Sequence, residues 1–302
     1  MYCLELSILL HRALEGRVET LMSSLSVPGW QEDPEGLHDV RVASRRMRAV
    51  LDLVQPGIYP GYKRQCRKLK ALTRALGRIR EMDVHMSLLE EMGQRVPGLA
   101  TCSGMEHALE RIELRRRKAR KAMARDLDGL DLDNLPRMLL VPNLPDPFRA
   151  GDLTGTIWDC LAPWLEGAFP GPGLLDQEDA VALHALRIRV KRLRYALEVL
   201  GAGFAAPPEG RLKHLKALQT ALGSHHDLAT LEALLESLHQ GLEARGRAVL
   251  AAGTQDVLVH IGEERLIAFE QFRALGVGMP RETFVASLRS DLGLAPGASA
   301  AP

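Results

Sequence analysis

The sequence has few cysteines, few aromatic residues and no long apolar run, and each scarcity excludes a class of protein. The four cysteines, Cys3, Cys66, Cys102 and Cys160, form no Cys-x-x-Cys pair, which argues against a zinc knuckle and fits free thiols in a reducing compartment. No apolar run approaches the roughly 20 residues that a membrane span needs. Three Trp, four Tyr and six Phe are too few for a base-stacking platform. These features predict a cytoplasmic protein without a membrane segment.

The sequence also lacks the alternating pattern of β-strands, because its apolar residues recur with helical spacing almost throughout. We therefore predict an all-α fold. The predicted helices cover residues 4–25, 36–54, 61–92 and 104–127 in the first half, and residues 153–168, 180–201, 209–240, 246–274 and 281–291 in the second. Asp33 and Asp179 stand where N-caps of the second and sixth of these helices belong.

The predicted helices fall on both sides of a proline-containing segment, which suggests how the chain is divided. Residues 1–128 and 153–292 would each form a four-helix bundle, the two being related by an internal pseudo-two-fold duplication. Residues 129–152 would link the two halves. Residues 293–302 are rich in Ala, Gly and Pro, and we expect them to be disordered.

An internal repeat is the most informative feature of the chain. Leu37-His38-Asp39-Val40-Arg41 returns 146 positions later as Leu183-His184-Ala185-Leu186-Arg187. The phrase Leu69-Lys70-Ala71-Leu72 returns at the same offset as Leu215-Lys216-Ala217-Leu218. Because self-similarity of this kind fixes architecture, the two halves should share a fold. What they share is mostly leucine, histidine and positive charge.

The repeated helices place their cations in rows on one face. In the first repeated helix, His38, Arg41, Arg45 and Arg48 fall on one side, and Val40, Met47, Val50, Leu51 and Val54 fall on the other. The second copy and the helices that follow behave alike. We predict that the full set of anion-binding residues is His38, Arg41, Arg45, Arg48, Lys63, Arg67, Lys70, Arg74, Arg78, His184, Arg187, Lys191, Arg194, Lys213 and Lys216.

Acids are nearly absent from these faces. Residues 37–80 contain 12 Lys and Arg but only Asp39 and Asp52 as acids. Like charges stacked on one helix face repel each other, so an anion is expected to supply the missing charge. Since the rows are several turns long and duplicated, that anion should be extended and multiply charged. A third basic window, residues 105–125, contains eight basic residues beside Glu106, Glu110 and Glu113.

These motifs resemble the CHAD family, the conserved histidine α-helical domain. The pattern is L-H-x-x-R-[VI]-x-x-[RK]-R-[ML]-R followed by L-K-x-L-x-x-x-L-G, and both halves of the chain carry it. The resemblance implies an all-helical fold of two four-helix bundles with a basic surface and cavity that binds inorganic polyphosphate, with no catalytic residue, metal or cofactor. It also implies association with polyphosphate granules. The ligands it implies are His38, Arg41, Arg45, Arg48 and Lys70, with His184, Arg187, Lys191, Arg194 and Lys216 in the second half.

The sequence departs from the family pattern in places. The family often has Arg-Asp after the Leu-Gly pair, where this chain has Arg80-Glu81 and His226-Asp227. Thr220 stands opposite Arg74, so the second positive row is weaker and the first half is expected to bind more strongly. The alternating-glutamate signature of the triphosphate-tunnel hydrolases fused to many relatives is absent. We expect a stand-alone member that is not an enzyme.

Three other functions are compatible with parts of the sequence. Nucleic acid is also a chain of phosphates, so sequence-nonspecific binding of DNA or RNA is one alternative. A helical scaffold for an acidic protein partner is another. His225-His226-Asp227 resembles the His-Asp pair of metal-dependent phosphohydrolases, but it aligns with a cation-acid pair in the first half. An orienting role for that acid is favoured over metal chemistry, which needs more ligands.

Overall fold

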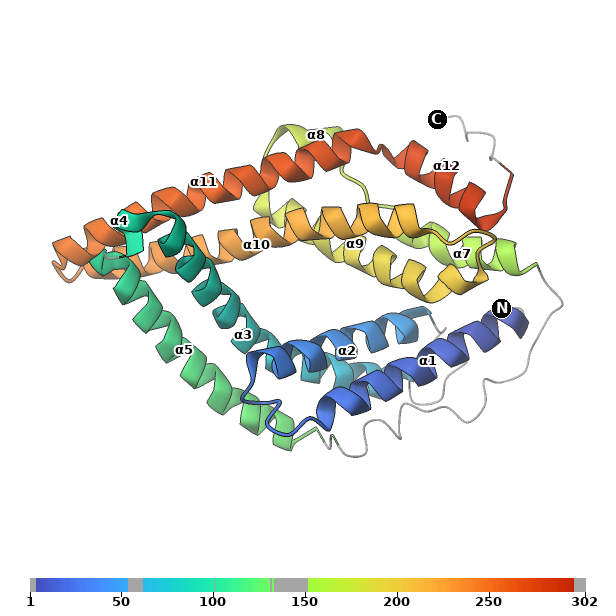
Figure 1. Ribbon diagram of the computed structural model, residues 1–302, viewed down its shortest axis with the longest axis horizontal. Helices are drawn as coiled ribbons and strands as arrows, with labels where there is room; N and C mark the ends of the chain where they lie inside the picture. Colours follow the sequence, from blue (N-terminus) through green and yellow to red (C-terminus); the bar gives the residue numbers. More distant parts are fainter. Residues whose placement is uncertain (1–3, 54–61, 101, 131, 133–151, 296–302) are drawn as a thin grey trace. The chain divides into compact units, whose positions relative to one another are not determined.

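The computed structural model describes residues 4–53, 62–100, 102–130, 132 and 152–295, and these residues form helices and no strand. The prediction of an all-α fold is confirmed. The helices are α1 (Leu4–Leu25), α2 (Pro34–Leu53), α3 (Tyr62–Arg95), α4 (Pro97–Ala100), α5 (Ser103–Asp128), α7 (Leu153–Leu165), α8 (Pro172–Asp176), α9 (Ala180–Leu200), the 3-10 turn η1 (Gly201–Gly203), α10 (Glu209–Glu243), α11 (Ala248–Gly278) and α12 (Arg281–Leu292) (Figure 1).

All nine predicted helices are present, with ends that differ by a few residues. Helix α7 ends at Leu165 rather than 168, because Pro163 lacks an amide hydrogen and Glu166 turns into an extended conformation. Helices α4 and α8 were not predicted, since four or five residues are too few to show a helical period. Most of the predicted linker (129–152) and of the predicted tail (293–302) lies outside the described residues.

The two repeated helices, α2 and α9, both begin with an aspartate N-cap. The Asp33 carboxylate accepts a hydrogen bond from the Gly36 amide at 2.9 Å, and α2 begins one residue later at Pro34. At the equivalent position, one Asp179 carboxylate oxygen accepts from the Val181 and Ala182 amides at 2.9 and 3.0 Å. Both predicted N-caps are confirmed. An aspartate at this position satisfies amides that the first turn of a helix leaves without partners.

The contacts between residues divide the chain into two compact units. The first unit contains Met1–Thr73, Leu130–Thr220 and Arg273–Pro302, and the second contains Arg74–Gly129 and Ala221–Phe272. Each unit therefore combines a segment of the first half of the repeat with one of the second. The division into an N-terminal and a C-terminal four-helix half follows the repeat rather than these contacts and stays a prediction.

In the first unit, α2 packs against α1 and α9, and α7 packs against α1, α9 and α12. The predicted apolar face of α2 is buried: Val40, Met47, Val50 and Leu51 are each 0% exposed. The equivalent residues of α9, from Leu186 to Leu197, are at most 3% exposed. Val54, the last residue predicted for that face, lies outside the described residues. The cationic rows are consequently left on the other faces of the two helices.

The second unit has a separate apolar core. The parts of α3, α5, α10 and α11 that belong to it meet around Leu89, Ile112, Leu231, Val257 and Ile261, each 0% exposed. On α3, His85 is buried beside this core and its Nε2 lies 3.0 Å from the Thr230 hydroxyl of α10. None of the helices in the described residues is both long enough and apolar enough to span a membrane.

Candidate functional site

Thirteen of the fifteen predicted anion-binding residues belong to the first unit. They lie on α2, on the first turns of α3, on α9 and on the first turns of α10. Arg74 and Arg78, further along α3, belong to the second unit, where both side chains are exposed. The predicted site is therefore mainly a feature of one compact unit to which both halves of the repeat contribute.

Two reciprocal ion pairs join the repeated helices α2 and α9. Arg46 Nε of α2 lies 3.9 Å from a carboxylate oxygen of Glu198, and Arg192 Nη2 of α9 lies 3.8 Å from a carboxylate oxygen of Asp52. Arg46 and Arg192 occupy equivalent positions of the repeat, as do Asp52 and Glu198. Exchange of contacts between equivalent residues is what a two-fold relation between two segments produces. The two cationic helices are thus held next to each other.

Each repeated helix is also hydrogen-bonded to the helix that follows it, through equivalent residues of that following helix. The Ser44 hydroxyl of α2 lies 3.0 Å from the Thr73 hydroxyl of α3. The Arg194 guanidinium of α9 donates to the Gln219 side-chain oxygen of α10 at 2.8 Å. Thr73 and Gln219 are equivalent in the repeat. The segments that carry the predicted residues therefore form a chain of neighbours, from α3 through α2 and α9 to α10.

For most of these cations, the described part of the chain offers no carboxylate within ion-pair distance. Arg45, Arg48 and Lys191 are half-buried, yet no carboxylate of the described residues lies within 4.0 Å of their charged groups. The same holds for the exposed side chains of Lys63, Arg67, Lys70, Lys213 and Lys216. A charge that is partly removed from water without a counter-ion costs free energy, and a bound anion lowers that cost. His38, Arg41, His184 and Arg187 are likewise half-buried and have polar or charged neighbours.

Arg194 differs from the other predicted residues because its charge is already engaged. Its guanidinium pairs with the Glu198 carboxylate one turn later and lies over the Tyr195 ring at 4.6 Å from the centroid, and its side chain is only 12% exposed. This arrangement orients α9 relative to α10. Arg194 is less available to a ligand than Arg48, its equivalent in the first half.

The pair at Glu198 is part of a cluster that the sequence alone did not reveal. Burial lowers the pKa of Arg17 on α1, and the Arg46 guanidinium lowers it further, while Glu198 and Tyr195 oppose the change. Arg17, Arg46 and Arg194 thus share a single carboxylate, so positive charge is in excess even here. The equivalence of Arg46 with Arg192, and of Asp52 with Glu198, was a signal for two of these residues. Arg17 has no counterpart in the repeat.

The His225-His226-Asp227 motif lies on α10 in the second unit. His225 is 1% exposed and its ring packs against Phe269, with the ring centroids 6.4 Å apart. His226 and Asp227 are half-buried. In the part of the chain that the structure describes, no group of three or more His, Cys, Asp or Glu side chains could hold a metal ion. The packing of His225 therefore accounts for its burial without metal ligation.

Comparisons with known proteins agree on one fold. A family model described as "CHAD domain" matches residues 13–236. The crystal structure of the CHAD domain from the plant Ricinus communis is 24% identical, with 93% of each chain covered and a TM-score of 0.67. PptA from Streptomyces chartreusis is 16% identical, with 89% of this chain and 98% of that chain covered and a TM-score of 0.65. No curated protein sequence matches this chain. At these identities the two structures show a shared fold.

Proposed function

The chain belongs to the CHAD family, and on this premise we propose that it binds inorganic polyphosphate without catalysing its conversion. CHAD domains are polyphosphate-binding modules, and this membership favours that ligand among the extended polyanions. The observation that carries the proposal for this chain is the set of half-buried cations, Arg45, Arg48 and Lys191, that no carboxylate of the described residues neutralises.

The residue types suit a chain of phosphates. An arginine guanidinium can donate to two phosphate oxygens at once, whereas a lysine ammonium acts as a movable point charge. In our proposal the half-buried cations of α2 and α9 make the oriented contacts, and the exposed lysines of α3 and α10 add attraction at longer range. The binding residues are those predicted from the sequence, except that Arg194 mainly orients the side chains of Gln219 and Glu198. The ligand should span both repeats because their helices are joined by the reciprocal ion pairs.

The proposal includes the architecture and location that the sequence predicts. Two four-helix halves would be related by an approximate two-fold axis, and the reciprocal pairing of Arg46 with Glu198 and of Arg192 with Asp52 supports this relation. The protein would be cytoplasmic and associated with polyphosphate granules. A fluorescent fusion that stays dispersed in cells containing stained granules would contradict the location but not the binding.

Two other kinds of ligand are alternatives to polyphosphate. Nucleic acid would meet the same cations, and an acidic protein could do so as well. The scarcity of aromatic side chains disfavours recognition of bases, so DNA or RNA should bind only through its backbone. A phosphate chain has no bases or sugars to accommodate, and its charge density is higher, which favours it on these cationic rows.

Titration of the full chain with polyphosphates of several lengths, beside an oligonucleotide of matched charge, tests the proposal. Affinity should rise with chain length until the rows are covered. It should fall with salt by a log–log slope of about −0.7 per contacted phosphate, if single-stranded nucleic acid is a fair analogue. Polyphosphate should displace the oligonucleotide, and the reverse exchange should be inefficient. Equal or tighter binding of the oligonucleotide would instead assign the site to nucleic acid.

Charge reversal locates the site. Arg45→Glu with Arg48→Glu should weaken long-chain binding by about 100-fold, because two contacts become repulsive. The control is Arg281→Glu, the same charge change on an exposed residue at the start of α12 outside the motif, which should have little effect. Arg45 and Lys191 are equivalent in the repeat, so Lys191→Glu measures the second half against Arg45→Glu in the first. Unchanged binding in the double variant would remove the site from α2.

A further inference from the structure

A cavity in the second unit lies away from the motif rows. It has a volume of about 700 Å³ and is walled by the first three turns of α5, the end of α10 and the beginning of α11. This volume is in the range of pockets that hold small ligands. The cavity is lined by Ser103, Glu106, His107, Glu110, Arg111, Arg115, Ser237, Leu238, Gly241, Leu242, Arg245, Arg247 and Leu250. Two of its four arginines, Arg245 and Arg247, lie beyond the residues that the family model matches.

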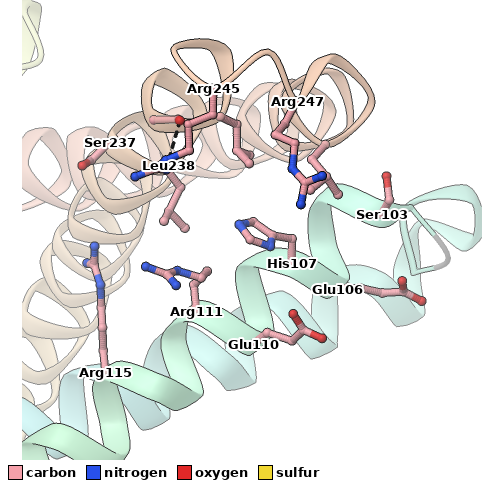
Figure 2. Close-up of a pocket in the computed structure, with 13 residues that line it drawn as sticks. Ser103, Glu106, His107, Glu110, Arg111, Arg115, Ser237, Leu238, Arg245 and Arg247 are labelled. Atoms are coloured by element: carbon pink, nitrogen blue, oxygen red, sulfur yellow. Dashed lines mark hydrogen bonds between the residues drawn. The ribbon is translucent and has the colours of Figure 1, made fainter.

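No carboxylate of the described residues pairs with the four arginines of the cavity. Among the described residues, no Asp or Glu oxygen lies within 4.0 Å of the guanidinium groups of Arg111, Arg115, Arg245 or Arg247. Two acids, Glu106 and Glu110, also line the cavity, so the formal charge of its walls is +2 with His107 neutral. Figure 2 shows His107, Arg111 and Arg115 extending from α5 toward the end of α10, and Arg247 reaching toward α5 from the opposite wall. The walls therefore present excess positive charge to one concave space.

Four other arginines of the same unit form ion pairs with carboxylates. Arg95 pairs with Glu264 at 2.8 Å, and Arg265 pairs with Glu232 at 3.0 Å. On α5 itself, Arg116 pairs with Asp83 at 2.6 Å and Arg117 with Glu113 at 2.9 Å. Acids therefore neutralise some arginines of this unit, whereas Glu106 and Glu110, which line the cavity, form no ion pair with its arginines among the described residues. The charge of the cavity is a local property rather than a shortage of acids.

The turn that carries Arg245 and Arg247 is fixed by backbone geometry. Gly246 has a φ of +66°, its amide donates to the Glu243 carbonyl at 2.9 Å, and the Arg247 amide donates to the Leu242 carbonyl at 3.0 Å. These two bonds form a Schellman motif, which needs a glycine at its left-handed position. An Arg245 guanidinium nitrogen donates to the Gly241 carbonyl at 3.1 Å. The C-terminal end of a helix attracts positive charge, which accounts for Arg245 and Arg247 at the end of α10. It does not account for Arg111 and Arg115 on the opposite wall.

A backbone crossing fixes the facing wall. A Cβ atom built on Gly104 of α5 would lie 2.0 Å from the Gly253 carbonyl carbon of α11, so the two helices meet without side chains between them. The crossing places Ser103 and His107 beside the first turn of α11, where Arg247 begins the cavity wall. Both walls are thus positioned by backbone contacts before any ligand is present. Such pre-organisation reduces the cost of ordering the arginines on binding.

From this geometry we propose that the cavity is a second anion site, which binds a compact oligophosphate such as inorganic triphosphate. Guanidinium groups from two walls can each donate in parallel to phosphate oxygens, and the Ser103 and Ser237 hydroxyls add neutral donors. The limited extent of the cavity suits a short anion, in contrast to the long rows of α2 and α9. Among the described residues that line the cavity there is no Phe, Tyr or Trp, so a nucleoside would find little aromatic surface on which to stack. The ligand is therefore the phosphate chain itself.

Calorimetric titration of the full chain with inorganic triphosphate tests this second site. Arg111→Gln with Arg247→Gln should weaken triphosphate binding by about tenfold or more, because one contact is lost from each wall. Arg117→Gln is the matched control, since Arg117 lies on the same helix, is 69% exposed and pairs with Glu113. It should bind triphosphate as the wild type does. The circular dichroism of all variants is compared to establish that helicity is retained.

Further titrations distinguish the two sites from each other, and distinguish inorganic triphosphate from a nucleoside triphosphate. The variant Arg45→Glu with Arg48→Glu should keep triphosphate binding while losing long-chain binding, and the cavity variant should show the reverse. Adenosine triphosphate should bind no more tightly than triphosphate, and tighter binding would overturn the choice of an inorganic ligand. Wild-type affinity for triphosphate in the cavity variant, or no triphosphate binding by the wild type, would overturn the second site. Neither result bears on long-chain binding, which is measured separately.

Discussion

In the first unit, the predicted cations that no carboxylate of the described residues neutralises lie along α2, α9 and the first turns of α3 and α10, whereas in the second unit four such cations gather around one cavity. The rows of the first unit continue over several helical turns. The cavity of the second unit joins three short segments around about 700 Å³. The comparison teaches that the arrangement of uncompensated charge indicates the shape of the anion. Long rows suit an extended anion, and a cluster around one cavity suits a compact anion.

The units also differ in how their cationic helices are held. In the first unit, α2 and α9 are joined by ion pairs between equivalent residues, so charge itself contributes to the scaffold. In the second unit, the walls of the cavity are positioned by a glycine crossing and a glycine turn, and no carboxylate of the residues that the structure describes pairs with the cavity arginines. Variants that disturb one scaffold should therefore leave the ligand of the other unit bound.

The largest expected effect is on the glycine crossing. Gly104→Ala should lower the free energy of unfolding by about 3 kcal/mol, because its Cβ would meet backbone atoms of Gly253 and Thr254 that have no flexible end to move. Urea unfolding measures the loss, and triphosphate binding should weaken with it. Gly262→Ala on α11 is the control, since the nearest atom to its Cβ would be a Glu232 carboxylate oxygen at 3.9 Å. It should stabilise the protein by up to about 1 kcal/mol. Similar losses in both variants would contradict the crossing.

The second prediction concerns His85, which is buried behind the wall of the cavity that carries Arg115. Burial lowers the pKa of His85 to about 4, and the Arg115 charge contributes. The unfolded chain, with a histidine pKa near 6.5, binds more protons between these values, so stability is complete above about pH 6.5 and is lost as pH falls toward 4. The shift corresponds to about 3 kcal/mol at most.

His85→Gln isolates this contribution, because an amide can keep a hydrogen bond to Thr230 but does not titrate in this range. Unfolding free energies of the wild type and the variant are measured between pH 4 and 8. The wild type should lose more stability than the variant as pH falls through this window, since other groups titrate alike in both. Parallel curves would show that His85 is not the titrating group.

Much of the fold could be predicted from the sequence, because helical periodicity is local. The apolar faces of α2 and α9 and the caps at Asp33 and Asp179 follow from residues a few positions apart. The cationic rows could be found because the repeat presents them twice. The residues that lie next to each cation in space could not be predicted from the repeat. Arg116 is neutralised by Asp83 from another helix, while no carboxylate in the described part of the chain pairs with Arg115 beside it.

The second unit was harder to predict because its defining contacts join segments far apart in the chain. Gly104 and Gly253 are ordinary helix glycines in the sequence, and only the crossing shows why neither carries a side chain. The basic window of residues 105–125 was visible, but the arginines that complete the cavity, Arg245 and Arg247, come from a turn more than a hundred positions later. A repeat could not reveal them, since the turn has no partner in the aligned segments.

The third prediction breaks the scaffold of the first unit. Glu198→Gln removes the carboxylate that Arg17, Arg46 and Arg194 share, and it should cost about 2 kcal/mol of unfolding free energy, since three guanidinium groups then face one another partly shielded from water. Added polyphosphate should raise the thermal midpoint more in this variant than in the wild type, because the ligand supplies negative charge. An equal increase in both would place the polyanion away from this cluster.

The smallest effect is expected at Asp52, the equivalent of Glu198 in the first half of the repeat. Its partner Arg192 is 57% exposed, lies 3.8 Å away and also rests over the Trp164 ring at 5.0 Å. Water screens this pair and the ring keeps Arg192 in place when the carboxylate is removed, so Asp52→Asn should cost less than about 1 kcal/mol. A double-mutant cycle with Arg192→Gln measures the pair directly. A coupling free energy as large as that between Glu198 and Arg46 would mean that the two ion pairs stabilise the protein equally. A smaller coupling free energy means that the contact between α2 and α9 depends chiefly on Glu198.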